Sequence, residues 1–500
     1  MAEFTFSTLT PTSYLDRAAT VFAERPAVVD GEARLTFAEL GERSHRLAGA
    51  LAGLGVQPWD RVAALCTNSH VMLEMHHGVP FAGAVLVPMD TRLSVRELSY
   101  IVEHSGARVL VATGELTAVA RLVAHAVPGV RLVVAGDIGD GADDEYESLL
   151  AAAEPLAVPC ADERDLLAIS YTSATTGPPK GVMYHHRGAA LQALAMAFHS
   201  RLAPGDRYLW TLPMFHCDGW CFPWAAAAAG ATQVCLRAVD AGEIWRLIRQ
   251  EGITHFCAAH TVLSMIADGY QAVGGPLPDP PVWVGTGGAP PSPTLLARMA
   301  ELRMQVTHRY GLAETYGPVT GNVIAERLRV VAEDGTDVPA DGATTGELVV
   351  RGNDVMLGYY RDAAATAAAT LGGWFRTGDL GVVHPDGYVE IRDHGRDLDV
   401  TSGAEGRRAV EIERVLGPAH GSWRRGHPGG MGFQVTEVQK SLKGFDYPGG
   451  PDDLAKHAES NGADRDLVEA LRGLDKDQFD GPNAVMHALG QDDELGGPTG

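Results

Sequence analysis

The feature that most constrains the fold of this 500-residue chain is a repeated alternation of short apolar runs with segments of helical periodicity. The runs occupy residues 62–65, 84–87, 107–111, 131–135, 232–236 and 282–285, and helical patterns begin at Phe37 and cover residues 243–250 and 294–302. Alternation of this kind predicts an α/β domain built on mostly parallel sheets that helices cover. Ligands of such sheets bind beyond the carboxyl ends of the strands.

The pattern changes twice toward the C-terminus. Short alternating strands at residues 347–352 and 387–391 predict a small β subdomain, and helical spacing returns after residue 433. Residues 420–432 lack periodicity and are rich in Gly, Arg and Pro, which is typical of a linker. We therefore expect a large domain over residues 1–393, a hinge remnant and linker over 394–432, a small acidic helical module over 433–490 and a disordered tail over 491–500.

Composition excludes several classes of protein. The formal net charge of −23 argues against a nucleic-acid-binding surface, which needs clustered Lys and Arg. The N-terminal residues lack a basic segment followed by an apolar core, and we expect no membrane span. The six cysteines are scattered without a C-x-x-C pair, so a disulfide framework or zinc ribbon is not expected. These features predict a cytoplasmic protein with reduced thiols.

A hydroxyl-rich loop follows the apolar run at residues 166–171. From residue 172 it reads Thr-Ser-Ala-Thr-Thr-Gly-Pro-Pro-Lys-Gly, with Lys180 as its only charge. Hydroxyl and backbone N–H groups donate to phosphate oxygens and a lysine adds a point charge, so the loop predicts a phosphate site. It is not a P-loop, because the early glycine and the hydroxyl after the lysine are both missing. A surface turn without a ligand is the alternative.

Two further segments carry acidic side chains on glycine-bounded turns. In the segment from Tyr310 to Thr315, Glu314 could act as a hard oxygen ligand for magnesium, and Tyr310 could offer a flat face to a purine. Asp379, which ends the segment beginning at Trp374, could accept both hydroxyls of a ribose. The alternatives are a solvated glutamate and an aspartate that caps a turn.

Together with the stretch from Trp210 to Cys221, these three segments resemble the acyl-adenylate-forming superfamily, in its branch of acyl-CoA synthetases that act on fatty or aryl acids. The resemblance covers roughly residues 8 to 416. It implies a reaction in two steps. A carboxylate attacks the α-phosphate of ATP to give acyl-AMP and pyrophosphate, and a thiol then takes the acyl group. ATP and Mg²⁺ are the implied cofactors, and the use of CoA is left open.

The resemblance also implies roles for individual residues, which act by orientation and electrostatic stabilisation. Lys180, Thr176, Glu314 and His216 match the catalytic positions, with Glu314 as the magnesium ligand and His216 beside the reacting carboxylate. For His216, a satisfied core histidine is the alternative. The positions that match nucleotide-binding residues are Ser173, Thr175, Gly177, Gly181, Gly288, Ala289, Tyr310, Gly311 and Asp379.

Several positions depart from the family pattern. Ala174 replaces a glycine of the phosphate loop, Ala313 replaces a threonine that contacts the α-phosphate, and His394 stands where an arginine binds ribose. After residue 416 the family's C-terminal domain, with its glycine-lysine motif, has no counterpart. Residues 433–490 resemble instead a small actinobacterial family of unknown function. We therefore expect acid adenylation to persist and the thioester step to be impaired.

Two hypotheses of different classes remain open. The chain is either an acyl-CoA synthetase-like ligase or a catalytically impaired scaffold. The scaffold would bind a nucleotide or an acyl group and present residues 433–490 to a protein partner. A fusion accident at the C-terminus is a third reading. The sequence does not fix the acid, the acyl acceptor or the oligomeric state.

Overall fold

The computed structural model describes residues 6–136, 145–172, 178–288, 291–319, 326–393, 410–411, 449–461, 468, 471–472 and 479. Contacts divide the chain into two compact units, Met1–Gly417 and Pro418–Gly500. The expected large domain lies within the first unit, and the boundaries expected at residues 393, 432 and 490 stay predictions. His394 and the hinge remnant around it lie outside the described residues, as does the expected tail.

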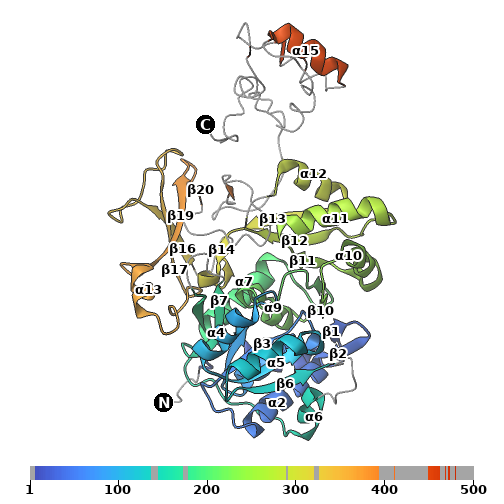
Figure 1. Ribbon diagram of the computed structural model, residues 1–500, viewed down its shortest axis with the longest axis vertical. Helices are drawn as coiled ribbons and strands as arrows, with labels where there is room; N and C mark the ends of the chain where they lie inside the picture. Colours follow the sequence, from blue (N-terminus) through green and yellow to red (C-terminus); the bar gives the residue numbers. More distant parts are fainter. Residues whose placement is uncertain are drawn as a thin grey trace. The chain divides into compact units, whose positions relative to one another are not determined.

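A six-stranded sheet with the order β6-β5-β3-β4-β7-β8 forms one layer of the first unit (Figure 1). Its strands are parallel, except that β8 runs antiparallel to β7. The apolar runs at residues 62–65 and 131–135 lie in β3 and β6, as the periodicity predicted. The strands are β3 (Arg61–Leu65), β4 (Val85–Pro88), β5 (Ala107–Thr113), β6 (Arg131–Ala135), β7 (Leu166–Thr172) and β8 (Lys180–His185).

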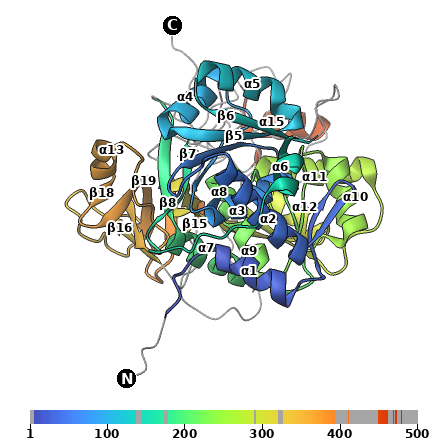
Figure 2. The same cartoon turned by 90° about the horizontal axis from the view of Figure 1, so that it is seen from below.

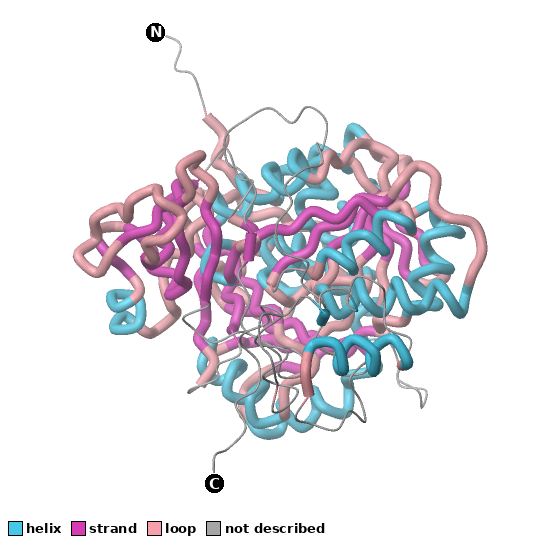
Figure 3. The backbone as a smooth tube through the Cα atoms, turned by 90° about the horizontal axis from the view of Figure 1, so that it is seen from above, coloured by secondary structure: helices cyan, strands magenta, loops and turns pink. Residues whose placement is uncertain are grey.

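A seven-stranded sheet with the order β13-β12-β11-β9-β10-β1-β2 forms a second layer, parallel except at its β2 edge. Figure 3 shows helices on both sides of its strands, which confirms the α/β prediction. The strands are β1 (Pro26–Asp30), β2 (Ala33–Thr36), β9 (Arg207–Leu209), β10 (Thr232–Val234), β11 (His255–Cys257), β12 (Val282–Gly287) and β13 (Met304–Arg309).

Local sequence explains where several helices begin. Thr36 and Ser94 cap α2 and α4, and each cap is closed by a glutamate three residues later. The helices of the first unit are α1 (Thr12–Val21), α2 (Phe37–Gly53), α3 (His70–Phe81), α4 (Val95–Ser105), α5 (Thr117–Ala126), α6 (Glu145–Ala152), α7 (His186–His199), α8 (Cys217–Trp220), α9 (Phe222–Ala229), α10 (Ala241–Leu247), α11 (His260–Val273), α12 (Pro293–Glu301) and α13 (Ala363–Ala368). Short 3₁₀ helices are η1 (Gly114–Leu116) and η3 (Ala313–Thr315), and η2 (Ile248–Gly252) is a π-helix.

The predicted β subdomain is an antiparallel sheet with the order β16-β17-β19-β20-β21, with β18 paired to β19. In Figure 2 it lies on the opposite side of the first unit from α10, α11 and α12. A two-stranded ribbon, β14 (Gly311–Leu312) and β15 (Gly317–Pro318), carries the predicted glutamate turn. The sheet consists of β16 (Glu326–Val331), β17 (Gly346–Gly352), β18 (Thr370–Leu371), β19 (Trp374–Val383), β20 (Val389–Asp393) and β21 (Val410–Glu411).

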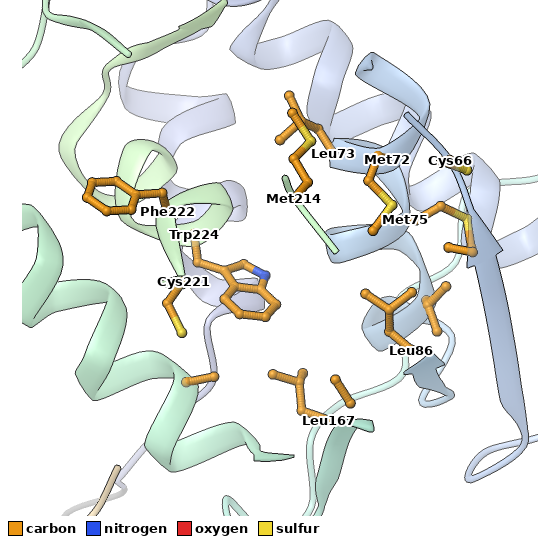
Figure 4. Packing of buried hydrophobic residues seen from close by; sticks show 14 of the residues in the cluster. Cys66, Met72, Leu73, Met75, Leu86, Leu167, Met214, Cys221, Phe222 and Trp224 are labelled. Carbon is orange, nitrogen blue, oxygen red and sulfur yellow. The ribbon is translucent and has the colours of Figure 1, made fainter. Parts of the chain in front are cut away.

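The largest apolar core joins the six-stranded sheet to the helices between the two parallel sheets. Figure 4 shows the Trp224 side chain pointing from α9 toward Met75 of α3 and Leu86 of β4. The Trp224 indole N–H donates to the carbonyl of His76 at 3.0 Å. Burial of apolar surface stabilises this interface by about 25 cal/mol per Å² removed from water. It fixes α7, α8 and α9 against the sheet that carries the phosphate loop.

Among the described residues of the second unit, one helix is defined, α15 (Pro451–Ser460). Leu454, Ala455 and Ala458 are buried on one face of it, which confirms the helical spacing expected at this position. The other helical segments expected after residue 433 lie mostly outside the described residues. Within the described part of the chain, no helix combines the length and apolar character that a membrane span requires.

Candidate functional site

Lys180 is the first residue of β8, directly after the predicted phosphate loop. The antiparallel register places Thr172 of β7 opposite Lys180, so the hairpin brings the two ends of the loop together at the carboxyl end of β7. The Lys180 side chain is exposed, and its Nζ lies 5.2 Å from the centre of the Tyr359 ring. Because the face of an aromatic ring attracts a cation, Tyr359 holds the ammonium group at this sheet edge.

Tyr359 also connects Lys180 to Glu314. Its hydroxyl donates to Glu314 Oε1 at 2.6 Å. The segment that carries Tyr359 is hydrogen-bonded to β8, because the Tyr360 N–H donates to the Gly181 carbonyl at 2.7 Å. A single aromatic side chain therefore links a lysine and a glutamate that are far apart in the sequence.

Glu314 lies in the η3 turn, which is fixed by hydrogen bonds on both sides. The Thr315 hydroxyl accepts from the N–H of Leu312 at 2.9 Å, and the Ala313 carbonyl accepts from the Tyr184 hydroxyl at 2.5 Å. Glu314 itself is half-buried and hydrogen-bonded, so it is not the freely solvated glutamate of the alternative interpretation. The turn thus holds the carboxylate in place before any ligand binds.

Tyr310 and Asp379 form a second pair. The Tyr310 hydroxyl donates to Asp379 Oδ2 at 2.5 Å, and the two residues are only 4% and 2% exposed. Burial, and then the charge of Asp379, raises the pKa of the Tyr310 phenol above its ordinary value, so the phenol remains a donor. The charge of Glu314 raises this pKa as well, which marks the two pairs as neighbours.

An irregularity in β19 sets the direction of the Asp379 side chain. The register of β17 against β19 shifts between Glu347 and Val349, where β19 carries extra residues before Leu380. A bulge of this kind bends a strand and re-aims its side chains. The Asp379 N–H donates to the hydroxyl of Thr377 at 3.0 Å inside the bulge.

His216 begins a segment with an unusual backbone. It is exposed, so the alternative interpretation of a core histidine is wrong. The next five residues, Cys217 to Cys221, all have positive φ values between 44° and 61°. A left-handed conformation costs about 1–2 kcal/mol for each non-glycine residue, and such strain persists where the surrounding structure over-determines it.

Asp218 lies fully buried inside this left-handed turn. Within the described residues, neither of its carboxyl oxygens has a hydrogen-bond partner. Burial raises the pKa of Asp218 to about 8, so the carboxyl group is mostly protonated at neutral pH. Sequence reasoning did not single out this residue, because a buried acid and a surface acid look the same in a sequence.

The glycines predicted to bind nucleotide differ in what surrounds them. A Cβ placed on Gly288 would meet no heavy atom within 4 Å, so Gly288 borders open space. A Cβ on Gly181 would lie 2.7 Å from Ile169, and one on Gly311 would lie 1.9 Å from the Gly317 carbonyl oxygen. Gly288 thus leaves room for a ligand, whereas packing of the protein itself requires the other two glycines.

The donor set fits magnesium that arrives with phosphate. Among the described residues, no group of three or more His, Cys, Asp or Glu side chains is arranged to hold a metal ion. Mg²⁺ is commonly bound through one or two carboxylates, with phosphate oxygens and water completing its shell. Glu314 offers one such carboxylate next to the strand that begins with Lys180.

The structure therefore links Lys180 to Glu314 through Tyr359, and Tyr310 to Asp379. That these residues share one nucleotide site stays a prediction. Sequence reasoning missed Tyr359, and the available signal was the Gly-Tyr-Tyr triplet that follows the first strands of the β subdomain. The predicted residues that lie outside the described ranges are Ser173, Ala174, Thr175, Thr176, Gly177 and Ala289.

Two family models match this chain. The model described as AMP-binding enzyme matches residues 15–360, and the model described as a protein of unknown function (DUF2795) matches residues 433–486. The first match spans the phosphate loop, the glutamate turn and Tyr359. The second confirms the resemblance of the C-terminal region to a family of unknown function.

Curated relatives and solved structures match most of this chain. The peroxisomal acetate/butyrate–CoA ligase of Arabidopsis thaliana is 39% identical over 82% of this chain and 80% of its own length, and the peroxisomal benzoate–CoA ligase of the same plant is 36% identical over 82% and 77%. The inhibitor-bound N-terminal domain of FACL13 from Mycobacterium tuberculosis has a TM-score of 0.70 and 28% identity, covering 77% of this chain and 99% of that domain. A fatty acyl CoA synthetase from the same organism has a TM-score of 0.69 and 29% identity, covering 77% and 78%.

Proposed function

This chain belongs to the AMP-binding enzyme family, in its acyl-CoA ligase branch, and from that premise we propose that it activates a fatty or aryl acid as an acyl-adenylate. The acid and ATP are the proposed substrates, and the acid oxygen attacks the α-phosphate while pyrophosphate leaves. The observation that carries the proposal is the contact chain from Lys180 through Tyr359 to Glu314.

Each linked residue has a role that its chemistry supports. Lys180 binds the outer phosphates of ATP together with the loop hydroxyls. Glu314 would hold Mg²⁺, which would supply positive charge to the phosphates. Asp379 receives the ribose, and its bond to Tyr310 orients the carboxylate at the edge of the nucleotide site. His216, which is exposed at the start of the left-handed turn, takes the place beside the reacting carboxylate. Preorganised charges of this kind stabilise the transition state without rearrangement.

Carboxylate-dependent exchange of labelled pyrophosphate into ATP tests the proposal. We expect exchange with at least one aliphatic or aryl acid, and a loss of about a hundredfold in Lys180→Ala, because a charged contact to the phosphates contributes about 3 kcal/mol. Lys456→Ala, at an exposed position of α15, is the control and should leave exchange unchanged. No exchange with any acid would contradict the proposal.

The sequence allows a second measurement that does not depend on turnover. Lys180 is the only lysine among residues 1–417, and the other four lysines all follow residue 439. Labelling with acetic anhydride and mass spectrometry will therefore report ATP contact at one position. Mg-ATP should slow labelling of Lys180 and leave Lys456 unaffected.

The proposal also includes a slow thioester step. Its support is that the match covers 99% of an N-terminal domain structure but 78% of a longer synthetase, and that residues 433–486 match a different family. CoA-dependent release of AMP should then be much slower than exchange. Rapid release by the full chain would contradict this part of the proposal and leave adenylation intact.

The competing function is a scaffold that binds ATP or an acyl group without chemistry. The observation that favours it is the separate family match at residues 433–486, which could serve a protein partner. The two functions differ in one result. Protection of Lys180 by Mg-ATP without exchange for any acid favours the scaffold, and protection with exchange favours the enzyme.

A further inference from the structure

His104, in the last turn of α4, reaches the β-hairpin that carries Lys180. We propose that the hydrogen bond between His104 and Tyr171 is a positioning device, which holds Lys180 where it receives the outer phosphates of ATP. The inference rests on the proposed function and deepens it, because it assigns two further positioning residues to the same nucleotide site. Since both act through other groups, their loss should weaken the binding of Mg-ATP and spare the chemical step.

The pairing of β7 with β8 places Tyr171 against the backbone next to Lys180. Tyr171 lies opposite Gly181 in the antiparallel register, and the next pair is Thr172 with Lys180. A Cβ on Gly181 would lie 3.1 Å from Tyr171 Cζ, so the phenol ring extends across β8 at the residue that follows Lys180. Cross-strand contacts of this kind stabilise a hairpin. A shift of the Tyr171 ring is therefore felt at the start of β8.

His104 fixes the outer end of the Tyr171 ring. The Tyr171 hydroxyl and His104 Nδ1 lie 2.8 Å apart, within hydrogen-bond distance, and the two rings meet edge to face at 84°. Burial, and then the charge of Arg361, lowers the pKa of His104, and burial raises the pKa of the Tyr171 phenol. The bond thus joins two neutral groups at neutral pH.

The same histidine contacts the segment that carries Tyr359. The rings of His104 and Tyr360 meet at 85°, with their centres 5.8 Å apart. The Tyr360 N–H donates to the Gly181 carbonyl at 2.7 Å, and the neighbouring Tyr359 ring faces Lys180 Nζ. His104 therefore contacts the hairpin and, through the Tyr360 ring, the segment that holds the ammonium group.

Helix α4 gives this contact a rigid base. Its buried face packs in one apolar core with Ile169 of β7, and Tyr171 packs against the same core. The helix ends at Gly106, whose left-handed backbone, with φ +67°, stops it directly after the turn that carries His104. The buried residues of the face are Leu98, Ile101, Val102 and Ser105. An anchor on a packed helix can keep a side chain in one orientation.

The competing explanation is that His104 and Tyr171 only pack at the edge of the apolar core. Lost packing lowers the fraction of folded protein, which lowers the kcat measured per total protein and leaves the KM for Mg-ATP unchanged. Lost positioning raises this KM, because Lys180 is oriented in fewer of the folded molecules. The division of the effect between KM and kcat separates the two explanations.

The test uses the full chain and measures pyrophosphate exchange against Mg-ATP concentration, with the acid that gives the wild type its fastest exchange. Tyr171→Phe keeps the ring on Gly181 and loses the hydroxyl, and His104→Phe keeps a ring among the same neighbours. In each variant the KM for Mg-ATP should rise about fivefold and kcat should stay within about twofold, since one neutral hydrogen bond is lost. The double variant should also rise about fivefold and not about twenty-fivefold, because both changes remove the same bond.

Two matched controls report general effects of the same substitutions. Tyr270→Phe loses a hydroxyl that donates to the Gly275 carbonyl at 2.7 Å in another part of the fold. His125→Phe replaces an exposed histidine that, like His104, lies in the last turn of a helix, here α5. Both controls should leave the KM for Mg-ATP unchanged, even where they lower the melting temperature.

Acetylation of Lys180 provides a second readout that does not depend on turnover. Without nucleotide, acetic anhydride should label Lys180 about twofold faster in Tyr171→Phe and His104→Phe than in the wild type, relative to Lys456, because the ammonium group spends less time over the Tyr359 ring. The Mg-ATP concentration that protects Lys180 by half should rise by the same factor as the KM.

The outcomes separate the inference from the proposed function. An unchanged KM in both Tyr171→Phe and His104→Phe, equal changes in the controls, or effects that multiply in the double variant overturn the inference while adenylation stands. No exchange with any acid overturns the proposed function, and half-protection of Lys180 then decides the inference. A raised half-protection concentration in the two variants supports it, and an unchanged one overturns it. If Mg-ATP does not protect Lys180 in the wild type, both are overturned.

Discussion

The cluster around Glu314 and the left-handed turn at residues 217–221 both border the proposed site, but they are built in opposite ways. In the cluster, Glu314 and Asp379 each accept a hydrogen bond from a tyrosine, at 2.6 Å and 2.5 Å. In the turn, the carboxyl oxygens of Asp218 have no partner among the described residues, and the backbone is left-handed throughout.

The difference shows what each region contributes. A cluster of satisfied charges can bind a triphosphate without rearrangement, because its electrostatic field is already oriented. The left-handed turn instead encloses a carboxyl group that burial keeps mostly protonated at neutral pH, so it offers little charge to a ligand. One region is therefore organised for charge, and the other for burial.

The largest effect is expected where the charge of the cluster is removed. Glu314→Gln keeps an oxygen that can accept from Tyr359 but loses the negative charge. We expect pyrophosphate exchange to fall about a hundredfold, or about 3 kcal/mol, because the transferring phosphates lose their metal ligand. Exposed Glu333→Gln is the control. A change of less than threefold in Glu314→Gln would show that the cluster is not organised for charge.

A smaller effect is expected from the buried acid of the turn, measured as unfolding free energy in urea. The pKa of Asp218 is raised from 3.8 to about 8 in the folded chain. Between these two pH values the native state therefore keeps a proton that the unfolded state has released. The contribution of Asp218 to the free energy of unfolding of the wild type is therefore fully present below pH 4 and is lost as the pH rises toward 8.

Asp218→Asn removes this dependence. Between pH 5 and pH 7 the stability of the variant relative to wild type should rise by about 2.6 kcal/mol, since each pH unit in this window contributes about 1.4 kcal/mol. Asp268→Asn at an exposed position should give no such trend. A flat difference for Asp218→Asn would mean that the carboxyl group is solvated or paired.

The smallest effect is expected from the link between Lys180 and Glu314. Tyr359→Phe retains the ring beneath Lys180 and loses the hydrogen bond to Glu314, which contributes about 1 kcal/mol. Exchange should fall about fivefold, with a raised KM for Mg-ATP. Tyr360→Phe is the matched control, because its hydroxyl lies 3.5 Å from its nearest carbonyl partner. Equal effects of the two variants would contradict a specific role for Tyr359.

Much of the fold could be predicted because periodicity reports which faces are buried. The run at residues 131–135 matches β6, and the helical pattern at residues 294–302 is shifted by one residue from α12. The strand predicted at residues 232–236 is two residues too long, because β10 ends at Val234. Strand ends depend on pairing with neighbours, which a local pattern does not report.

Some residues of the candidate site could likewise be predicted from the sequence, and others could not. Lys180, Glu314 and Asp379 could be singled out because each has a glycine nearby in the sequence, where a charged residue is conspicuous. Tyr359 could not, because a tyrosine near a β strand is most often a core residue. Asp218 could not be singled out either, because burial and a left-handed backbone are not written in the local sequence.

The sequence alone determined the chemical groups of this protein: which residues can carry charge, where apolar periodicity requires strands and helices, and which turns can accept phosphate. Only the tertiary structure decided how these groups are combined, namely that Tyr359 joins Lys180 to Glu314 and that Trp220 lies against Gly287 and Gly317. The physical reason is the separation along the chain over which each effect acts. Propensity and periodicity act over a few residues, whereas hydrogen bonds, desolvation and packing act between any residues that the fold brings together.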